Sequence, residues 1–422
     1  MAGVGERLVA VVGQGYVGLP LAVRAVEVGY RVVGFDVDKE RVDRLRNGST
    51  YIDDVSDADI AAALATGRFR PTGDESDLAR FDVAVVTVPT PLHDGVPDLG
   101  CVEAAARMLA PHVRSGCCVV LESTSYPGTT QDVFIPLLEC GLWRAGQDFR
   151  VGYSPERIDP SNPTWTLRNT PKIVAGIDGT STRVVADFYS TLVDRVVPVS
   201  GIREAELAKV LENTFRHVNI ALVNELAIFC HQLGIDVWSV IDAAATKPFG
   251  FMRFTPGPGV GGHCLPIDPS YLSWQVRRSL RQTFRFVEVA NDVNEHMPDY
   301  VTSRVTAYLN RKRKAVNGST VVLLGLAYKR NSGDARHSPA IAVARRLATL
   351  GANVLAVDPL IDAGQVPAQV ILVECTDELL SAADLVVVLT DHDAIDWSMV
   401  HRYRDHVLDT RSRLGVAACD RL

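Results

Sequence analysis

The feature that most constrains the fold is a glycine turn near the start of the chain, residues 13–18 (GQGYVG). The turn follows an apolar run, residues 8–12, and precedes a stretch of helical pattern, residues 19–28. A second apolar run, residues 31–35, ends in Asp36. A strand, a glycine turn, a helix and a second strand that ends in an acid are the fingerprint of a Rossmann dinucleotide-binding unit.

Each residue of this fingerprint has a physical role. Gly13 permits the tight turn, Gly15 lets the backbone approach a pyrophosphate, and Gly18 lets helix and strand pack closely. Asp36 is expected to accept hydrogen bonds from the ribose hydroxyls and to repel a 2′-phosphate, which favours NAD over NADP. The predicted cofactor-binding residues of the turn are Gly13, Gly15, Tyr16, Val17 and Gly18.

The chain divides into three parts. Further apolar runs, residues 83–88, 118–121 and 172–175, follow the glycine turn, and helical patterns separate most of them. From about residue 203 to 233 there is no Gly or Pro, and apolar residues recur at helical spacing, which predicts a long helix. We expect domains at 1–200, 201–300 and 301–422.

The third part repeats the first. Residues 351–358 parallel residues 29–36, each with a Gly, a strand and a terminal Asp. The repeat lacks the second and third glycines of the turn, so we expect it to hold a ligand other than a dinucleotide. The predicted fold is α/β, with two doubly wound Rossmann-like domains joined by a helical connector that contains the long central helix.

Composition excludes several kinds of partner. The net charge is −7 and no long basic block occurs, so no nucleic-acid partner is expected. No run reaches the roughly 18 uninterrupted apolar residues of a membrane span. The eight cysteines form no CxxC pair and no zinc spacing, which predicts a reducing, cytoplasmic location and no metal site.

The chemistry points to a loop of unusual glycine content, residues 256–269 (PGPGVGGHCLPIDP). Dense glycines leave the backbone bare for close approach to a ligand. Cys264 lies in this loop, unlike the other seven cysteines, and in a chain built for NAD it is a candidate nucleophile. His263 is adjacent, and we expect it to make a local structural hydrogen bond.

Other candidate residues lie on the long helix and after two strands. Lys209 and Asn213 are four positions apart and share a helix face. Pro89 and Thr90 follow one predicted strand and Thr124 follows another, where ligands bind in parallel sheets.

Taken together, these motifs resemble the UDP-glucose/GDP-mannose dehydrogenase superfamily along essentially the whole chain. Within it, the bacterial UDP-N-acetylglucosamine 6-dehydrogenases are most similar. The matching segments are residues 13–22 (GQGYVGLPLA), 122–130 (ESTSYPGTT), 154–157 (SPER), 206–215 (ELAKVLENTF), 247–252 (KPFGFM) and 256–269.

The resemblance implies an NAD-dependent, four-electron oxidation of the C6 alcohol of a nucleotide sugar, through a thiohemiacetal and a thioester on Cys264. It implies that Lys209 and Asn213 stabilise the oxyanion, that Asp268 and Lys209 act in acid–base steps, and that Glu156 serves in thioester hydrolysis with water placed by Thr124. The implied cofactor-binding residues outside the glycine turn are Asp36, Pro89, Thr90, Thr124 and Arg336. The implied substrate-binding residues are Glu156, Arg157, Lys209, Asn213, Phe249, Phe251, Gly261 and Lys329. The resemblance also implies a homodimer, and a product that is used in polysaccharide or glycoside synthesis.

The sequence departs from the family at Arg253, where Pro is usual, and around Arg336, where Asp334-Ala335-Arg336-His337 replaces a Thr followed by Arg-Glu. UDP-N-acetylglucosamine is the first expectation, and UDP-glucose, dTDP-glucose and UDP-N-acetylmannosamine stay open. Two rival functions are a two-electron dehydrogenase that needs no loop cysteine and a non-catalytic NAD-binding regulator.

Overall fold

The predicted β–α–β unit at the start of the chain is present. β1 (Leu8–Val12) leads through the glycine turn into α1 (Gly18–Glu27), and β2 (Arg31–Phe35) follows. Gly29 has a φ of +103°, a left-handed conformation that ends the helix and that glycine adopts without strain. The computed structural model describes residues 6–52, 54–93, 95–139, 141–159, 162, 164–262, 265–415 and 420–422, in two units, Met1–Glu212 and Asn213–Leu422.

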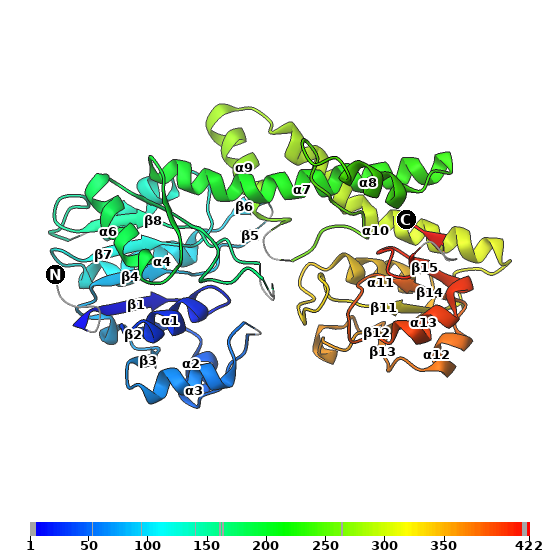
Figure 1. Ribbon diagram of the computed structural model, residues 1–422, viewed down its shortest axis with the longest axis horizontal. Coiled ribbons are helices and arrows are strands. Elements are labelled where there is room, and N and C mark those ends of the chain that lie inside the picture. Colours follow the sequence, from blue (N-terminus) through cyan, green and yellow to red (C-terminus); the bar gives the residue numbers. More distant parts are fainter. Residues whose placement is uncertain are drawn as a thin grey trace. The chain divides into compact units, whose positions relative to one another are not determined.

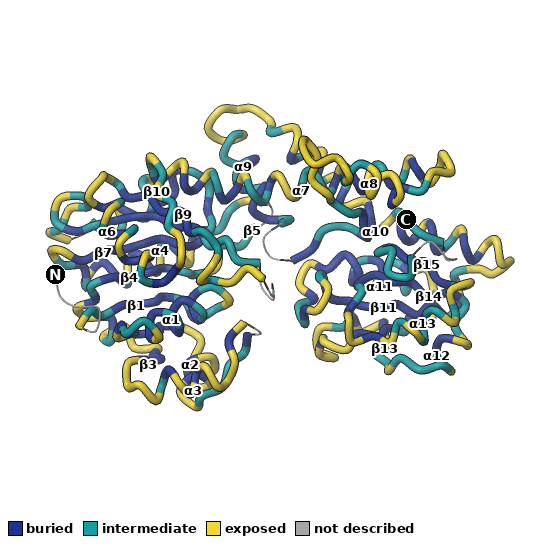
Figure 2. The backbone as a smooth tube through the Cα atoms, viewed as in Figure 1, coloured by how far each residue is buried: buried dark blue, intermediate teal, exposed yellow. Residues whose placement is uncertain are grey.

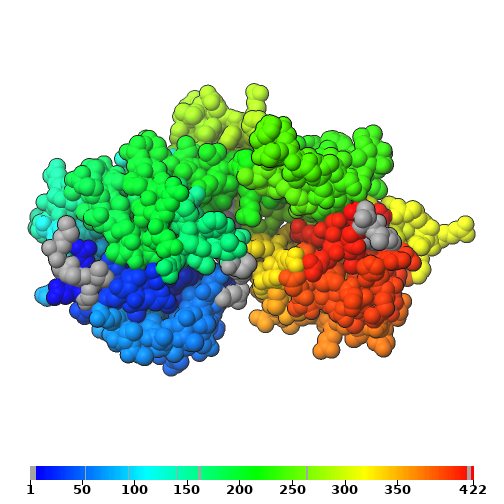
Figure 3. All heavy atoms as spheres, in the orientation of Figure 1, coloured from blue at the N-terminus to red at the C-terminus, as the bar shows by residue number. Residues whose placement is uncertain are grey.

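The first unit contains an eight-stranded sheet in the order β10-β9-β8-β7-β4-β1-β2-β3, which can be followed in Figure 1. Its other strands are β3 (Phe69–Thr72), β4 (Val83–Val86), β7 (Cys118–Leu121), β8 (Arg150–Tyr153), β9 (Lys172–Gly176) and β10 (Val196–Pro198). The other helices of this unit are α2 (Lys39–Arg46), α3 (Asp57–Ala65), α4 (Gly100–Leu109), α5 (Ile135–Leu138) and α6 (Gly179–Ser190), and a hairpin joins β5 (Leu92–His93) to β6 (Val96–Pro97). In the space-filling view, residues near 40–80 lie at one end of this unit and residues near 180–200 at the other (Figure 3).

Alternate residues of each central strand enter different cores. Val9 and Val11 pack into one buried cluster, whereas Ala10 and Val12 pack into another. Both faces of the sheet are therefore covered, as a continuous apolar strand requires. Figure 2 shows the strands as buried and the outer helices as largely exposed on one side.

One pairing differs from the predicted parallel sheet. β8 and β9 run antiparallel, with Tyr153 opposite Ala175. The segment between them forms no crossover helix in its described part, and a parallel return would require such a crossover. The alternation of strands and helices predicts parallel pairing, and the sheet follows it except at this pair.

The long central helix is confirmed as α7 (Ile202–Leu233). It is followed by α8 (Val237–Ala245), α9 (Asp268–Leu280) and α10 (Arg285–Arg311). Among the described residues, no helix is long and apolar enough to cross a membrane.

The second unit contains a six-stranded parallel sheet in the order β13-β12-β11-β14-β15-β16. Its elements are β11 (Thr320–Leu324), α11 (Pro339–Thr349), β12 (Asn353–Val357), β13 (Ile371–Leu372), α12 (Asp377–Ala382), β14 (Leu385–Val388), α13 (Trp397–Arg402), β15 (Val407–Asp409) and β16 (Asp420–Arg421). Val321 and Leu323 face one core and Val322 and Leu324 the other, as in the first sheet. The two Rossmann-like domains predicted from the repeat are confirmed.

Candidate active site

The glycine turn has the geometry that a dinucleotide needs. Gly13 has a φ of +94°, and a Cβ there would lie 3.0 Å from the carbonyl oxygen of Thr87. A Cβ on Gly18 would overlap the backbone of Gly13, whereas a Cβ on Gly15 would meet nothing within 4 Å. Gly15 therefore faces open space at the start of α1, where N–H groups and the helix dipole favour a phosphate. Tyr16 and Val17 complete the turn, and the residues present fit NAD.

Asp36 closes this site at the end of β2. Its Oδ2 accepts a hydrogen bond from the Gln14 N–H at 2.8 Å, and its Oδ1 accepts one from the Asp38 N–H at 2.9 Å. Two residues that the sequence analysis missed lie beside it. The Arg41 guanidinium is 3.5 Å from Oδ2, and the Tyr51 hydroxyl donates to the carbonyl of Gln14. No motif marked them, because both reach this point only through folding.

Asp36 is expected to determine the choice between NAD and NADP. Replacing Asp36 by serine is expected to lower kcat/KM for NAD by about 10- to 100-fold, the usual weight of a hydrogen bond to a charged group. Activity with NADP should fall less, because the repelling carboxylate is gone. Initial rates with both cofactors test this. Asp38→Ser is the control, because Asp38 caps α2 through the N–H groups of Glu40 and Arg41.

The carboxyl ends of four strands form one edge. Val12 pairs with Val86, Val86 with Leu121, and Leu121 with Tyr153, so the residues that follow these strands lie along the same side of the sheet. The Thr90 hydroxyl donates to the carbonyl of Thr124 at 2.8 Å. The structure thus joins two predicted residues, Thr90 and Thr124, at the edge that carries the glycine turn, and Pro89 lies exposed beside them.

Glu156 and Arg157 follow the fourth of these strands. The Glu156 Oε1 accepts hydrogen bonds from the N–H groups of Arg157 at 2.6 Å and Ile158 at 2.7 Å. Arg157 forms an ion pair with Glu212 of α7 at 2.7 Å and donates to the carbonyl of Pro171 at 2.6 Å. Arg157 therefore links the strand edge to the long helix.

A buried carboxylate that the sequence analysis did not single out also ties α7 to this edge. Glu206 accepts hydrogen bonds from the N–H and hydroxyl of Thr130, at 2.9 and 2.6 Å, and from the Gly128 N–H. Burial raises the pKa of Glu206 to about 7. Lys209 lies one turn further along α7 and is 8% exposed, which excludes the ordinary solvated lysine.

Asn213 and Asp268 are brought together in the second unit. The Asn213 Nδ2 donates to the Asp268 Oδ2. Asp268 is the first residue of α9 and is 4% exposed. The contact joins α7 to the end of the glycine-rich loop. His263 and Cys264 themselves lie outside the described residues.

The rest of the glycine-rich loop packs against residues 328–339, an insert that follows β11 in the C-terminal domain. The Gly262 N–H donates to the Arg336 carbonyl at 3.3 Å, and a Cβ on Gly261 would lie 2.8 Å from the Pro339 ring. The Arg336 guanidinium is held by Asp334, at 2.6 Å. Lys329 precedes this pair in the same insert and is half-buried.

A buried amide holds the start of the loop. The Gly257 N–H donates to Asn224 Oδ1 at 2.9 Å, and Asn224 Nδ2 donates to Asn294 Oδ1 at 2.9 Å, which fixes the loop to α7 and α10. Phe249 and Phe251, just before the loop, are 70% and 41% exposed. Large exposed rings of this kind mark a contact surface.

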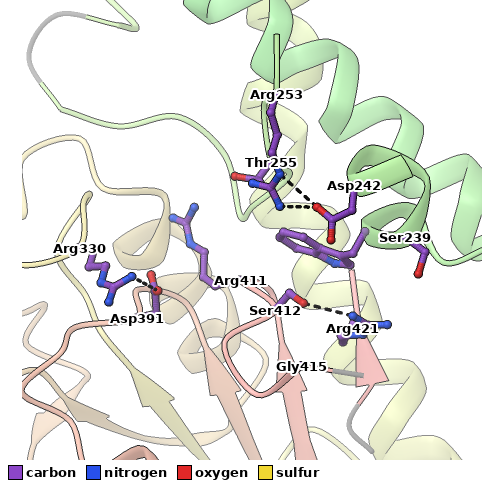
Figure 4. Close-up of a pocket in the computed structure, with 11 residues that line it drawn as sticks. Ser239, Asp242, Arg253, Thr255, Arg330, Asp391, Arg411, Ser412, Gly415 and Arg421 are labelled. Atoms are coloured by element: carbon purple, nitrogen blue, oxygen red, sulfur yellow. Dashed lines mark hydrogen bonds and ion pairs between the residues drawn. The ribbon is translucent and has the colours of Figure 1, made fainter. Parts of the chain in front are cut away.

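A pocket of about 560 Å³ in the second unit is lined by α8, by the segment just before the glycine-rich loop and by the C-terminal domain (Figure 4). Arg253 is paired with Asp242 at 2.7 Å, and Arg330 with Asp391 at 3.5 Å. Figure 4 shows Arg411 between these two pairs, and its Nε donates to the Leu389 carbonyl at 2.8 Å. The lining residues are Trp238, Ser239, Asp242, Arg253, Thr255, Arg330, Asp391, Arg411, Ser412, Gly415 and Arg421. Four guanidinium groups against two carboxylates suit an anionic ligand such as a diphosphate.

The acid that repeats Asp36, Asp358, also accepts backbone hydrogen bonds, and a buried histidine adds a contact that Asp36 lacks among the described residues. Asp358 Oδ2 accepts from the N–H groups of Leu326 at 2.7 Å and Ala327 at 3.0 Å. The fully buried His392 contributes a further contact at 3.2 Å. These hydrogen bonds hold the pKa of Asp358 below its usual value even though burial opposes this. The expectation that this domain takes another ligand agrees with this additional contact.

The fold and these groups define a class: a dehydrogenase with one dinucleotide domain and a second Rossmann-like domain lined with arginines. Three models of one family match the chain: the NAD binding domain over residues 7–193, the central domain over 203–296 and the UDP binding domain over 322–415.

Named relatives agree with this match. The UDP-N-acetyl-D-glucosamine 6-dehydrogenase of Pseudomonas aeruginosa is 38% identical over 84% of this chain and 83% of its own. The UDP-N-acetyl-D-mannosamine dehydrogenase of Pyrococcus horikoshii is 32% identical over 96% and 95%. A solved structure of that Pyrococcus enzyme has a TM-score of 0.88 and covers 97% of each chain. The chain belongs to the UDP-glucose/GDP-mannose dehydrogenase family, and it is an NAD-dependent oxidoreductase.

Proposed function

We propose that this enzyme oxidises the C6 alcohol of a UDP-N-acetylhexosamine, UDP-N-acetylglucosamine first, to the uronate in two hydride transfers. The observation that carries the proposal is the contact of Asn213 with the buried Asp268, at the end of the loop that bears Cys264. An amide donor and a carboxylate, the latter four positions after a cysteine in the sequence, are groups that covalent oxidation of an aldehyde needs.

The proposed roles follow from chemistry. Bound NAD accepts a hydride in each oxidation. Asp268 and Lys209 take the proton of the alcohol, and the Cys264 sulfur adds to the aldehyde carbon to form a thiohemiacetal. Lys209 and Asn213 donate to the oxygen that carries negative charge. The second oxidation leaves a thioester, which water attacks with help from Thr124 and Glu156.

The arginine pocket is proposed to hold the diphosphate. Arg411 and Arg330 line it, and a Cβ on Gly257 would contact the Arg411 guanidinium, so the pocket adjoins the glycine-rich loop. Lys329 and Arg336 come from the same insert as Arg330. Phe249, Phe251 and Gly261 are proposed to contact the sugar. The relatives act on different N-acetylhexosamines by name, and Arg253 lies where contacts to the substrate are expected.

The deciding experiment counts NADH formed per nucleotide sugar consumed, with a panel of UDP- and dTDP-hexoses and their N-acetyl forms. Two NADH and a uronate product support the proposal, and the panel ranks the sugars. One NADH per sugar, with an aldehyde or ketone product, would show that the enzyme is a two-electron dehydrogenase. NAD binding without turnover on any member would favour a regulator.

We also propose a cytoplasmic homodimer formed through α7. Its large exposed apolar residues fall within about 80° of one another at about 100° per residue, so they form one stripe. Leu211, Leu222 and Leu233 are 60%, 60% and 72% exposed. The stripe consists of Leu207, Leu211, Phe215, Leu222, Phe229 and Leu233. Such a continuous apolar stripe on one chain is suited to a second copy.

Placing a charge in this stripe should break the dimer. Leu211→Glu is expected to give a monomer at micromolar concentration by light scattering, because a carboxylate would be desolvated at the interface. Leu142→Glu, at a loop leucine that is 91% exposed, is the control and should not change the mass. A monomeric wild-type protein would overturn the proposed dimer.

A further inference from the structure

Three charged side chains are buried together behind the carboxyl edge of the first sheet: Glu122, Lys172 and Glu156. Their side chains are 0%, 3% and 13% exposed. Removing an ammonium and two carboxylates from water costs several kcal/mol per ion before their attraction is counted, and apolar residues of similar size are often as stable. Stability alone is therefore a weak reason for this cluster.

The antiparallel strand creates the cluster. Glu122 directly follows β7, and Glu156 lies three residues beyond β8. Lys172 is the first residue of β9, and a parallel β9 would place it at the opposite edge of the sheet. Because β9 runs antiparallel to β8, its first residue reaches the edge that carries Glu156.

The contacts leave Glu156 held from two sides. Lys172 Nζ is 3.1 Å from Glu156 Oε2, while Oε1 accepts the two backbone N–H groups described above. Lys172 also forms a close ion pair with Glu122. The Tyr189 hydroxyl donates to Glu122 Oε2 at 2.7 Å, and its ring lies 5.4 Å from Nζ. Glu122 and Tyr189 thus fix Lys172, which in turn fixes Glu156.

The charges favour an ionised Glu156. Burial would raise its pKa, but Lys172 and the Ile158 N–H outweigh burial and lower it. Burial raises the pKa of Glu122 to about 7 in spite of Lys172. Burial would lower the pKa of Lys172, yet the two carboxylates raise it. Of the two carboxylates, Glu156, the one nearer solvent, is therefore the more readily ionised.

We propose that Lys172 is a positioning residue for thioester hydrolysis, whose ammonium keeps Glu156 ionised and oriented. The inference rests on the proposed function. In this step a water oxygen bonds to the thioester carbon and one water proton passes to Glu156. The carbon–sulfur bond breaks with its electron pair going to Cys264 Sγ, and the proton on Glu156 then leaves to solvent.

Lys172→Met tests the role of the ammonium. Removing a cation this close should raise the Glu156 pKa by about one pH unit or more, so the acidic limb of kcat moves to higher pH by that amount. At a pH on that limb, kcat should fall about tenfold for each pH unit that the limb moves. An acyl adduct should accumulate on Cys264, visible by intact mass after acid quench, while KM for the nucleotide sugar should not rise.

Three further variants separate this role from folding. Lys172→Met with Glu122→Gln removes the unpaired buried charge and should show the same pH shift and adduct. Glu122→Gln alone keeps Lys172, whose Nζ can still donate to the amide oxygen, so the limb should move much less. Arg304→Met breaks a buried ion pair with Asp420 in the second unit and should lower stability without moving the limb.

The outcomes are distinct. A wild-type enzyme that makes no uronate refutes the proposed function. The inference about Lys172 alone is overturned if the wild-type enzyme makes uronate but Lys172→Met, with and without Glu122→Gln, keeps the wild-type acidic limb and accumulates no acyl adduct.

Discussion

Replacing Cys264 by alanine is expected to lower the rate of uronate formation by on the order of 10³-fold or more, the scale seen when a covalent nucleophile is removed. The physical reason is that no other group would bind the aldehyde carbon, so the second oxidation would lose its covalent intermediate. NADH formation and the product, measured by mass spectrometry, should both show the loss. Binding of NAD in the absence of sugar should stay within twofold or so, because the cofactor turn is in a different domain.

Cys101→Ala is the matched control, because Cys101 is an exposed thiol on α4. It should leave turnover unchanged. Uronate formation that survives in Cys264→Ala would contradict the thioester route and favour the two-electron rival.

Replacing Lys209 by methionine is the second large expected effect. Loss of one preorganised donor to an oxyanion lowers kcat by about 10²- to 10³-fold. Lys209 is 8% exposed, so its ammonium is poorly solvated and its charge acts at short range in a low dielectric. Methionine preserves most of the volume, and unfolding by urea should show whether the helix is intact.

Arg216→Met is the control for this variant, because Arg216 is exposed on the same helix, about 140° around it from the middle of the apolar stripe. Its kcat should match the wild type. If Lys209→Met raised KM while kcat stayed constant, Lys209 would be a ground-state binding residue and its oxyanion role would be wrong.

Local patterns predicted much of the fold. The glycine turn, Asp36 and the long α7 are encoded within short windows, where glycine conformation and helical periodicity decide the structure. The repeat of the strand that ends in Asp358 predicted the second sheet for the same reason. Of the candidate site, the contact of Asn213 with Asp268 fits residues that were selected from their segments alone.

The features that the sequence did not predict depend on contacts between residues that are far apart along the chain. The direction of β9 depends on which strand it meets, and an apolar run is the same whether it runs parallel or antiparallel. Lys172 and Glu122 are 50 positions apart, and Arg41 reaches Asp36 only after α2 folds. The apolar stripe on α7 also resembles a core pattern, because periodicity does not distinguish a face that packs in the chain's own core from one that packs against a partner.

The contact of Asp358 with a buried histidine has a consequence for the order of events in catalysis. Only one of the two duplicated domains keeps the complete glycine turn. On the proposed chemistry, both oxidations therefore use a single nicotinamide-binding site. On that chemistry, NADH would have to dissociate and a second NAD would have to bind between the two oxidations, while the half-oxidised sugar stays on the enzyme. Scarce NAD or abundant NADH would therefore stall the enzyme between its two oxidations, and the bond to sulfur would keep the reactive aldehyde from escaping into the cell during that wait.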